Sequence, residues 1–250
     1  MQNFKKVFLA AAVTLAFSAG AMAETLKMGI EAAYPPFNNK DASGQVVGFD
    51  KEIGDALCAK MKAECSVVTS DWDGIIPALN AKKFDFLISS LSITEERKAA
   101  VDFTDPYYSN KLQFIALKSV DFKTDKDSLK GKTIGTQRAT LAGTWLDDTY
   151  GTDVDVKLYD TQENAYLDLT SGRVDAILAD KYANYDWLKT DAGKNYEFKG
   201  DPVVESDKIG IAVRKGDNEL RNKLNAALKE IVADGTYKKI NDKYFPFSIY

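Results

Sequence analysis

The chain has 250 residues, and its 33 basic and 37 acidic side chains give a formal net charge of -4. An acidic chain of this size favours one or two soluble domains and argues against nucleic acid or another polyanion as a partner. It contains no histidine and two cysteines, so a metal site is poorly supported and no cofactor is expected.

Residues 1–23 have the organisation of an export signal. Two lysines precede an apolar run, and Ala21-Met22-Ala23 has the small residues that fit a signal-peptidase site. A membrane anchor is the alternative, but an apolar core of about 15 residues is short of the roughly 20 that span hydrocarbon. We therefore predict cleavage after Ala23 and a secreted mature chain of residues 24–250.

The first part of the mature chain alternates between strand-like and helical patterns. We predict strands at 26–32, 65–70 and 84–90, and helices at 49–62 and 72–83. The apolar residues of the first helix recur every four positions, at Phe49, Ile53, Leu57 and Met61. Alternation of this kind predicts α/β layers with a mainly parallel sheet.

The two cysteines lie close together, Cys58 in the first predicted helix and Cys65 at the start of the next strand. In an exported chain this spacing predicts one local disulfide between the helix and the strand. A pair of reduced, buried thiols is the alternative.

A second set of elements follows in the same style. Strands are predicted at 133–137, 156–160 and 174–180, and helices at 140–150 and 161–172. One more strand, 209–216, precedes a long helix from Asp217 with Gly235 as its stop; its apolar residues in register are Leu220, Leu224, Leu228 and Ile231.

One internal similarity relates the two sets. Residues 78–90 and 168–180 align without a gap, each with a helix end, a basic residue, an aspartate and a strand. The aligned strands finish at Ser90 and Asp180. Ligands bind at the carboxyl ends of strands in open parallel sheets, so two such lobes would form a cleft between polar strand ends. Chance resemblance between two generic α/β units is the alternative.

The segment SSLSITEERK, residues 89–98, leads from an apolar strand into a charged run. Thr94 is the predicted N-cap of a short helix, which places Arg97 in its first turn, against the helix dipole. An anion would give this arginine a purpose, because its planar fork matches a carboxylate. A surface arginine paired with Glu96 or Asp102 is the alternative.

Two more segments offer polar groups after strands. The segment 135–145 runs from a strand into a helix whose free amides at Thr140 and Leu141 could bind an anion, although it lacks the pattern of a phosphate loop. Glu31, Tyr34 and Trp72 combine an acid with two aromatics, which a cationic side chain would select. Core packing is the alternative for the aromatics.

Together these segments resemble the polar amino-acid-binding proteins of bacterial ABC importers, in particular the lysine/arginine/ornithine- and histidine-binding group. The resemblance covers essentially the whole mature chain. It is carried by AAYPPF, GFD at 48–50, WDGIIPAL, SSLSITEERK, VDFTDPYY, DGTYKKI and the Cys58/Cys65 spacing.

The resemblance implies a two-lobed periplasmic-binding-protein fold of type II, in which each lobe is a mixed sheet flanked by helices and two hinge strands join the lobes. Lobe 1 would comprise 24–110 plus 204–250, and lobe 2 would comprise 111–203. The protein would act as a monomer in the periplasm. It would capture a basic L-amino acid by hinge closure and deliver it to an inner-membrane ABC permease.

The same resemblance implies a role for each site residue. The ligand α-carboxylate would meet Arg97, the backbone amides of Ser92 and Leu141, and Thr140. The α-ammonium would meet Asp180, the Ser90 carbonyl and the Ser92 hydroxyl. The ligand side chain would lie among Glu31, Tyr34, Trp72, Ser89 and Gln137.

Three positions depart from the family pattern. Glu31 stands where an aspartate is usual, Gln137 replaces an apolar residue, and Ala139 replaces a glycine. The pocket is therefore expected to suit arginine best, with ornithine, lysine or histidine as possible ligands, because tryptophan at position 72 favours stacking of a guanidinium.

Two other classes of function fit parts of the pattern. The same fold carries periplasmic cyclohexadienyl dehydratases, which act on prephenate or arogenate, and Glu31 and Asp180 would then be acid and base. The absence of histidine and of a nucleophile with an adjacent base argues against such an enzyme. A ligand-sensing domain of a receptor would need a membrane segment or a cytoplasmic module, neither of which follows Tyr250 in this sequence.

Overall fold

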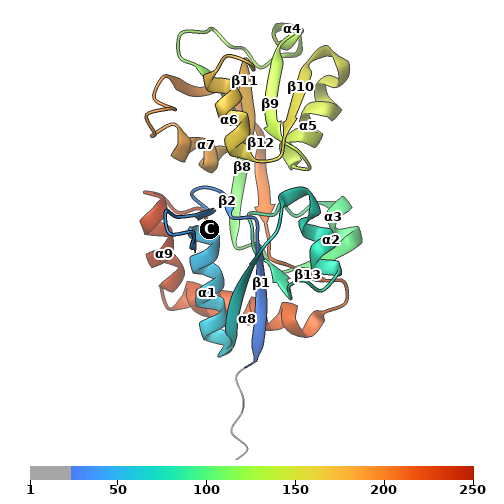
Figure 1. The fold of residues 1–250 in the computed structure, drawn as a ribbon, viewed down its shortest axis with the longest axis vertical. Coiled ribbons are helices and arrows are strands. Elements are labelled where there is room, and N and C mark those ends of the chain that lie inside the picture. The colour runs from blue at the N-terminus through green and yellow to red at the C-terminus, as the bar shows by residue number, and fades with distance from the viewer. Residues whose placement is uncertain (1–23) are drawn as a thin grey trace, which may run out of the picture.

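A computed structural model describes residues 24–250. The predicted signal peptide, 1–23, lies outside the described residues. Two α/β lobes lie one above the other and are joined by two long strands (Figure 1). This arrangement confirms the predicted two-lobed fold.

The first lobe is built on a five-stranded sheet in the order β5-β1-β6-β13-β7. Strand β1 pairs in parallel with β5 and β6, whereas β13 pairs antiparallel with β6 and β7. The sheet is therefore mixed and not mainly parallel. Its strands are β1 Thr25–Ile30, β5 Glu64–Thr69, β6 Phe86–Leu87, β7 Val101–Phe103 and β13 Ala212–Arg214.

Helices cover both faces of this sheet. On one face α1, α8 and α9 share a hydrophobic core with β1, and on the other face η1 and α2 pack against β6 and β13. The predicted helical stripe is confirmed, since Phe49, Ile53 and Leu57 are fully buried. The helices are α1 Phe49–Met61, η1 Trp72–Gly74, α2 Ile75–Asn80, α3 Glu95–Ala100, α8 Asn218–Ala233 and α9 Thr236–Tyr244.

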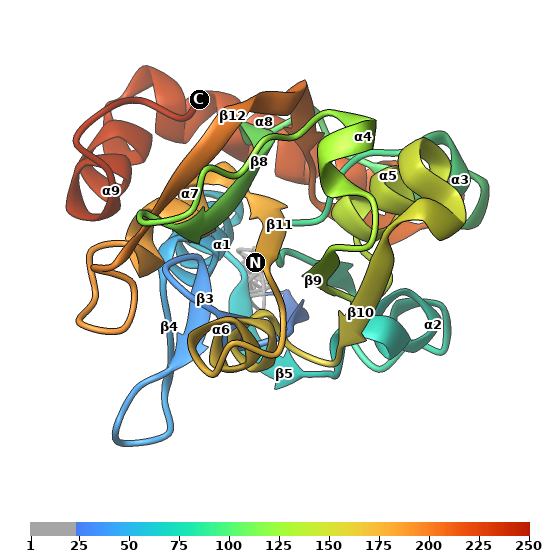
Figure 2. The ribbon, with the colours of Figure 1, turned by 90° about the horizontal axis from the view of Figure 1, so that it is seen from above.

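The second lobe repeats the design with the order β10-β9-β11-β8-β12. Alternate residues of β8 face opposite sides: Phe114 packs with α5, and Ile115 packs with α6. Figure 2 shows this sheet from above, between its helices. Its elements are β8 Tyr108–Leu117, α4 Lys126–Leu129, β9 Thr133–Gln137, α5 Leu141–Tyr150, η2 Gly151–Asp153, β10 Asp155–Tyr159, α6 Gln162–Thr170, β11 Ala176–Asp180, α7 Lys181–Trp187 and β12 Tyr196–Ile209.

Strands β8 and β12 cross from one lobe to the other. They pair antiparallel from Tyr196 opposite Leu117 to Ile209 opposite Tyr108, with register shifts on either side of Val204. Val204 pairs with Leu112, where the pairing of β8 with β11 also ends, so the ladder is interrupted where β8 and β12 pass beyond the rest of the second sheet.

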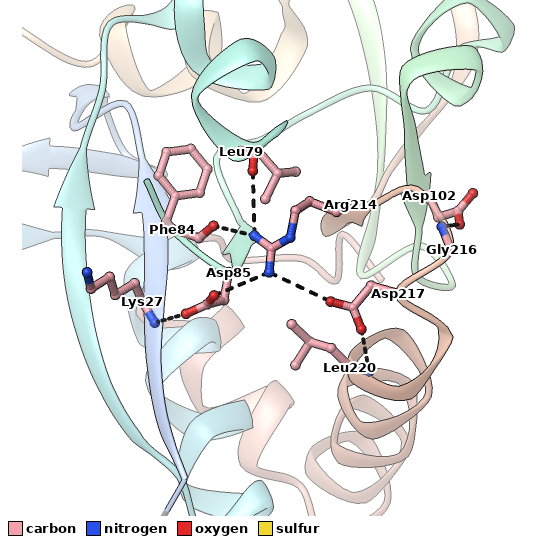
Figure 3. A network of polar contacts seen from close by, with 9 residues as sticks. All are labelled: Lys27, Leu79, Phe84, Asp85, Asp102, Arg214, Gly216, Asp217 and Leu220. Atoms are coloured by element: carbon pink, nitrogen blue, oxygen red, sulfur yellow. Dashed lines mark hydrogen bonds and ion pairs between the residues drawn. The ribbon is translucent and has the colours of Figure 1, made fainter. Parts of the chain in front are cut away.

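The internal similarity between the lobes has a structural basis. The carboxylate of Asp85 accepts the backbone N–H of Lys27 at 2.9 Å, and that of Asp175 accepts the N–H of Thr133 at 2.9 Å. Each aspartate thus ties its strand to the start of the lobe's first parallel strand. In the first lobe Arg214 extends this contact, donating to Phe84 O at 2.7 Å and to Asp85 Oδ1 at 3.3 Å (Figure 3).

Several elements differ from their predicted extent. The strand predicted at 84–90 is shorter, forming β6 over Phe86–Leu87, and the chain lies in the left-handed region at Ser90, with a φ of 53°. The helix predicted at 72–83 begins as a 3₁₀ turn and ends at Asn80. The strand predicted at 209–216 is divided between β12 and β13. A small sheet of β2 Ala33–Tyr34, β3 Asn38–Lys40 and β4 Val46–Val47 was not predicted.

The predicted disulfide is present, linking Cys58 of α1 to Cys65 of β5 with 6.1 Å between their Cα atoms. None of the helices formed by residues 24–250 combines the length and apolarity needed to cross a membrane.

Candidate functional site

A small cavity lies between the lobes and gathers every residue predicted for the site. Its volume is ≈ 20 Å³, which is room for about one water molecule. The lining residues are Glu31, Tyr34, Trp72, Ser89, Ser90, Ser92, Arg97, Gln137, Thr140, Leu141, Gln162, Ala179 and Asp180.

Arg97 reaches from the first lobe to the second. Thr94 caps its helix as predicted, with Oγ1 accepting the Arg97 N–H at 3.2 Å. The guanidinium donates through Nη1 to Ser92 O at 2.9 Å and through Nη2 to Ala139 O at 2.9 Å. It lies 5.6 Å from the centre of the Trp72 ring. The ion pairs of residues 24–250 include none between Arg97 and Glu96 or Asp102, so the alternative pairing is not seen.

Ala139 connects the two lobes through its backbone carbonyl. Its carbonyl also accepts the indole N–H of Trp72 at 3.2 Å, and its φ of 54° places it in the left-handed region. Next to it, Arg138 approaches Asp73 of the first lobe at 3.8 Å. The loop between β9 and α5 is therefore tied to the first lobe at two adjacent residues.

The N-terminus of α5 faces the same cavity. Thr140 is its N-cap, with Oγ1 accepting the N–H of Gly143 at 3.3 Å and donating its own proton to Gln137 O at 2.7 Å. With the hydroxyl proton engaged, only backbone N–H groups of this turn remain to donate to an anion.

The Ser90 backbone is held by a buried acid outside the cavity. Asp50, within the GFD motif, accepts the Ser90 hydroxyl at 2.9 Å and the Tyr107 hydroxyl at 2.6 Å. The Tyr107 oxygen in turn accepts the Ser90 N–H at 3.1 Å. Because the amide and the hydroxyl of Ser90 are engaged, its carbonyl is the group available to a ligand.

Asp180 ends β11 at the cavity and lies in an acidic environment. Burial raises the pKa of its carboxyl group, and the charge of Asp207 raises it further. The side chains of Tyr34 and Asn110 approach the carboxyl group and favour the ionised form, as does the charge of Arg97. A cation placed beside Asp180 would restore its ionisation.

Glu31 forms the far end of the cavity. Its backbone N–H donates to the Ser89 hydroxyl at 3.0 Å, and its Oε1 accepts the amide of Gln137 from the other lobe at 2.6 Å. Burial raises the pKa of Glu31 to about 7, and the charges of Asp50 and Asp71 add to that effect. Tyr34 and Trp72 are each 8% exposed and line the cavity between the two ends.

Four residues of the site were missed from the sequence. Gln162 and Ala179 line the cavity. Asp207 and Asn110 lie behind it, on the two strands that join the lobes. Their side chains are hydrogen-bonded to each other. Gln162 follows the strand end at Tyr159, so the strand-end argument applied to Ser90 and Asp180 could have found it.

The fold and the site define a class of protein: a two-lobed binding protein that encloses a small polar molecule between its lobes. The chain belongs to a known family of that class, the bacterial extracellular solute-binding proteins, family 3, whose pattern matches residues 26–247.

Characterised relatives are similar over nearly the full length. The L-arginine-binding protein of Pseudomonas aeruginosa is 45% identical over 90% of this chain and 89% of its own. The lysine/arginine/ornithine-binding periplasmic protein of Escherichia coli K12 is 41% identical over 95% of this chain and 94% of its own. An ancestral arginine-binding protein bound to arginine superposes with a TM-score of 0.83 at 38% identity, over 90% of this chain and 99% of that one. All three relatives are named as binding proteins.

Proposed function

We propose that this protein binds a basic L-amino acid, preferentially arginine, in the periplasm and delivers it to an inner-membrane ABC permease. The balance of charge around the cavity carries this proposal. The residues that line the cavity include two carboxyl groups, those of Glu31 and Asp180, and one basic group, the guanidinium of Arg97. The acids therefore outnumber the bases. The α-amino and α-carboxyl groups of an amino acid cancel, so a cationic side chain supplies the missing positive charge.

We assign the roles of the residues from the donor and acceptor groups that they bring to the cavity. Arg97 and the amides at the start of α5 would hold the α-carboxylate. Asp180, the Ser90 carbonyl and the Ser92 hydroxyl would hold the α-ammonium. Each of these groups is a donor or an acceptor of the required kind, and each lines the one cavity.

The side-chain end favours a guanidinium. Glu31 offers a carboxylate, Ser89 and Gln137 offer acceptor oxygens, and the rings of Tyr34 and Trp72 offer flat faces. A planar guanidinium can stack on an aromatic ring while donating to several acceptors, whereas an ammonium is a compact, strongly hydrated charge. Arginine therefore ranks before ornithine, lysine and histidine.

Entry of the ligand requires the lobes to part, because a cavity of ≈ 20 Å³ has no room for an amino acid. We propose that the two lobes, 24–110 with 204–250 and 111–203, move as a hinge about β8 and β12 in a monomer. Ligand contacts from both lobes then stabilise the closed form, so the affinity reflects the difference between the open and closed states.

Calorimetric titration of the ligand-stripped mature protein with the twenty amino acids plus ornithine tests the proposal. Arginine should bind most tightly, and Arg97→Ala should weaken its binding more than tenfold, because a charge-assisted contact to the carboxylate is lost. Arg173→Ala is the matched control: that arginine is 59% exposed and pairs with Asp168 in the second lobe, away from the cavity. No binding of any basic amino acid, or a loss below tenfold for Arg97→Ala, would refute the proposal.

The dehydratase alternative has a direct test. Glu31 and Asp180 are the acids it would use; Glu31 accepts a hydrogen bond from the Gln137 amide, and the side chains of Tyr34 and Asn110 approach the carboxyl group of Asp180. Incubation with arogenate should give no absorbance from an aromatic product. A steady rate of product formation would instead support the enzyme.

A further inference from the structure

Asp207 lies beside the cavity on β12, one of the two strands that join the lobes. It pairs in register with Asn110 of β8. The segment that carries Ser92 runs along the same strand: Ser92 bridges Ile209, and the Ile93 N–H donates to Lys208 O at 2.8 Å. The acid is thus fixed against the wall of the cavity.

The contacts of Asp207 are unequal between its two oxygens. Oδ2 accepts the Ser92 hydroxyl at 3.0 Å and the Asn110 amide at 3.3 Å. Oδ1 is buried and has no hydrogen-bond partner among residues 24–250, and neither has the buried Oδ1 of Asn110. Asp207 itself is 2% exposed. Unmatched acceptors on a buried acid cost free energy unless a cation lies nearby.

The bond to Asp207 determines what Ser92 can offer a ligand. A serine hydroxyl has one proton, and that proton is donated to Asp207 Oδ2. Toward the cavity the Ser92 oxygen can therefore only accept a hydrogen bond. An ammonium is a donor without acceptor capacity, so this orientation suits an ammonium and disfavours a second acceptor.

The charges around Asp207 and Asp180 also favour a cation at this end of the cavity. The guanidinium of Arg97 interacts with both Asp207 and Asp180, so two carboxyl groups share one nearby arginine. Burial raises the pKa of both carboxyl groups, and the Asp207 charge adds to the shift of Asp180. A second positive charge placed between Ser92 and Asp180 would favour the ionised form of both.

We propose that Asp207 is a positioning residue for the α-ammonium of the ligand: it turns the Ser92 hydroxyl into an acceptor and adds negative potential at that end of the cavity. This inference rests on the proposed function, since it concerns the amino end of the same amino-acid site. The alternative is that Asp207 only connects β12 to the first lobe and does not act on the ligand.

Two ligands distinguish these roles. Arginine carries the α-ammonium, and 5-guanidinopentanoate has the same guanidinium and carboxylate without it. For Asp207→Asn we expect an affinity for arginine that falls at least tenfold, as for one charge-assisted hydrogen bond, and an affinity for 5-guanidinopentanoate that changes less than threefold. Both are measured by calorimetry or by competition. Glu205→Gln is the control, because Glu205 is an acid on the same strand that pairs with Lys111 at the surface; it should leave both affinities unchanged.

Ser92→Ala provides a second variant in case Asp207→Asn does not fold. It removes the accepting oxygen and leaves Asp207 in place, and it should show the same selective loss for arginine. An equal loss for both ligands would mean that Asp207 and Ser92 only support the fold, and no loss would mean that they do not act on the ammonium; either result overturns the inference while the proposed function stands. Failure of the unmodified protein to bind arginine would overturn both.

Discussion

Trp72→Phe tests whether a hydrogen bond between the lobes contributes to affinity. The substitution keeps an aromatic ring against the cavity but removes the indole N–H, which donates to Ala139 O at 3.2 Å. A neutral hydrogen bond stabilises by about 0.5–1.5 kcal/mol net. The lower half of that range applies, because the bond is long and Ala139 O keeps Arg97 as a second donor. A loss of about 0.5–1 kcal/mol corresponds to an affinity that is roughly two- to fivefold weaker.

The full effect is seen when the free protein is mostly open, since the closed form then contributes its stability to binding. Calorimetry with arginine and with ornithine separates this effect from stacking, because loss of the bond weakens every ligand that closes the cleft by the same factor. Loss of stacking weakens the guanidinium ligand more. An unchanged affinity for ornithine in Trp72→Phe would refute the idea that the bond favours closure.

Three further predictions concern stability and pH. Replacing Cys58 and Cys65 together by serine should lower the free energy of unfolding by about 2 kcal/mol and leave the arginine affinity unchanged. Urea unfolding measures the stability and calorimetry measures the affinity. A weakened affinity would contradict this prediction. Arginine affinity should fall as the pH drops below about 7, because the pKa of Glu31 is raised to about 7 and only its ionised form attracts a guanidinium. Glu31→Gln should remove part of that dependence, so an unaltered pH profile of binding would be evidence against it. Ala139→Gly should raise the free energy of unfolding by up to about 1 kcal/mol, because glycine adopts the left-handed conformation without a Cβ penalty; a lower urea midpoint would contradict this reasoning.

The arrangement of lobes and most of the cavity could be predicted because they depend on short-range patterns. Helical stripes and strand runs specify the elements, and ligands bind where parallel strands end. Ser90 and Asp180 were found in this way, and Arg97 was found from its position against a helix dipole. The roles assigned to these residues came from the family resemblance and stay predictions until binding is measured.

The remaining features depend on contacts between distant segments. Asp207 lies within a 14-residue strand, in a polar stretch that gives no periodic signal. Its burial arises only when β8 and the Ser92 segment pack on either side of that strand. The short β6 is a second example, since the chain lies in the left-handed region soon after it, at Ser90, which is hydrogen-bonded to Asp50 and Tyr107, 40 and 17 positions away. No local pattern carries such information.

The contacts between the lobes set a limit on affinity. The bonds from Gln137 to Glu31 and from Arg97 to Ala139 use groups that a ligand would also need. A ligand therefore gains only the difference between its own bonds and those that it replaces. A zwitterion with a cationic side chain gains most, because it replaces the neutral amide at Glu31 and the neutral carbonyl at Arg97 by oppositely charged partners, which adds a Coulomb attraction to the hydrogen bond at each end of the cavity.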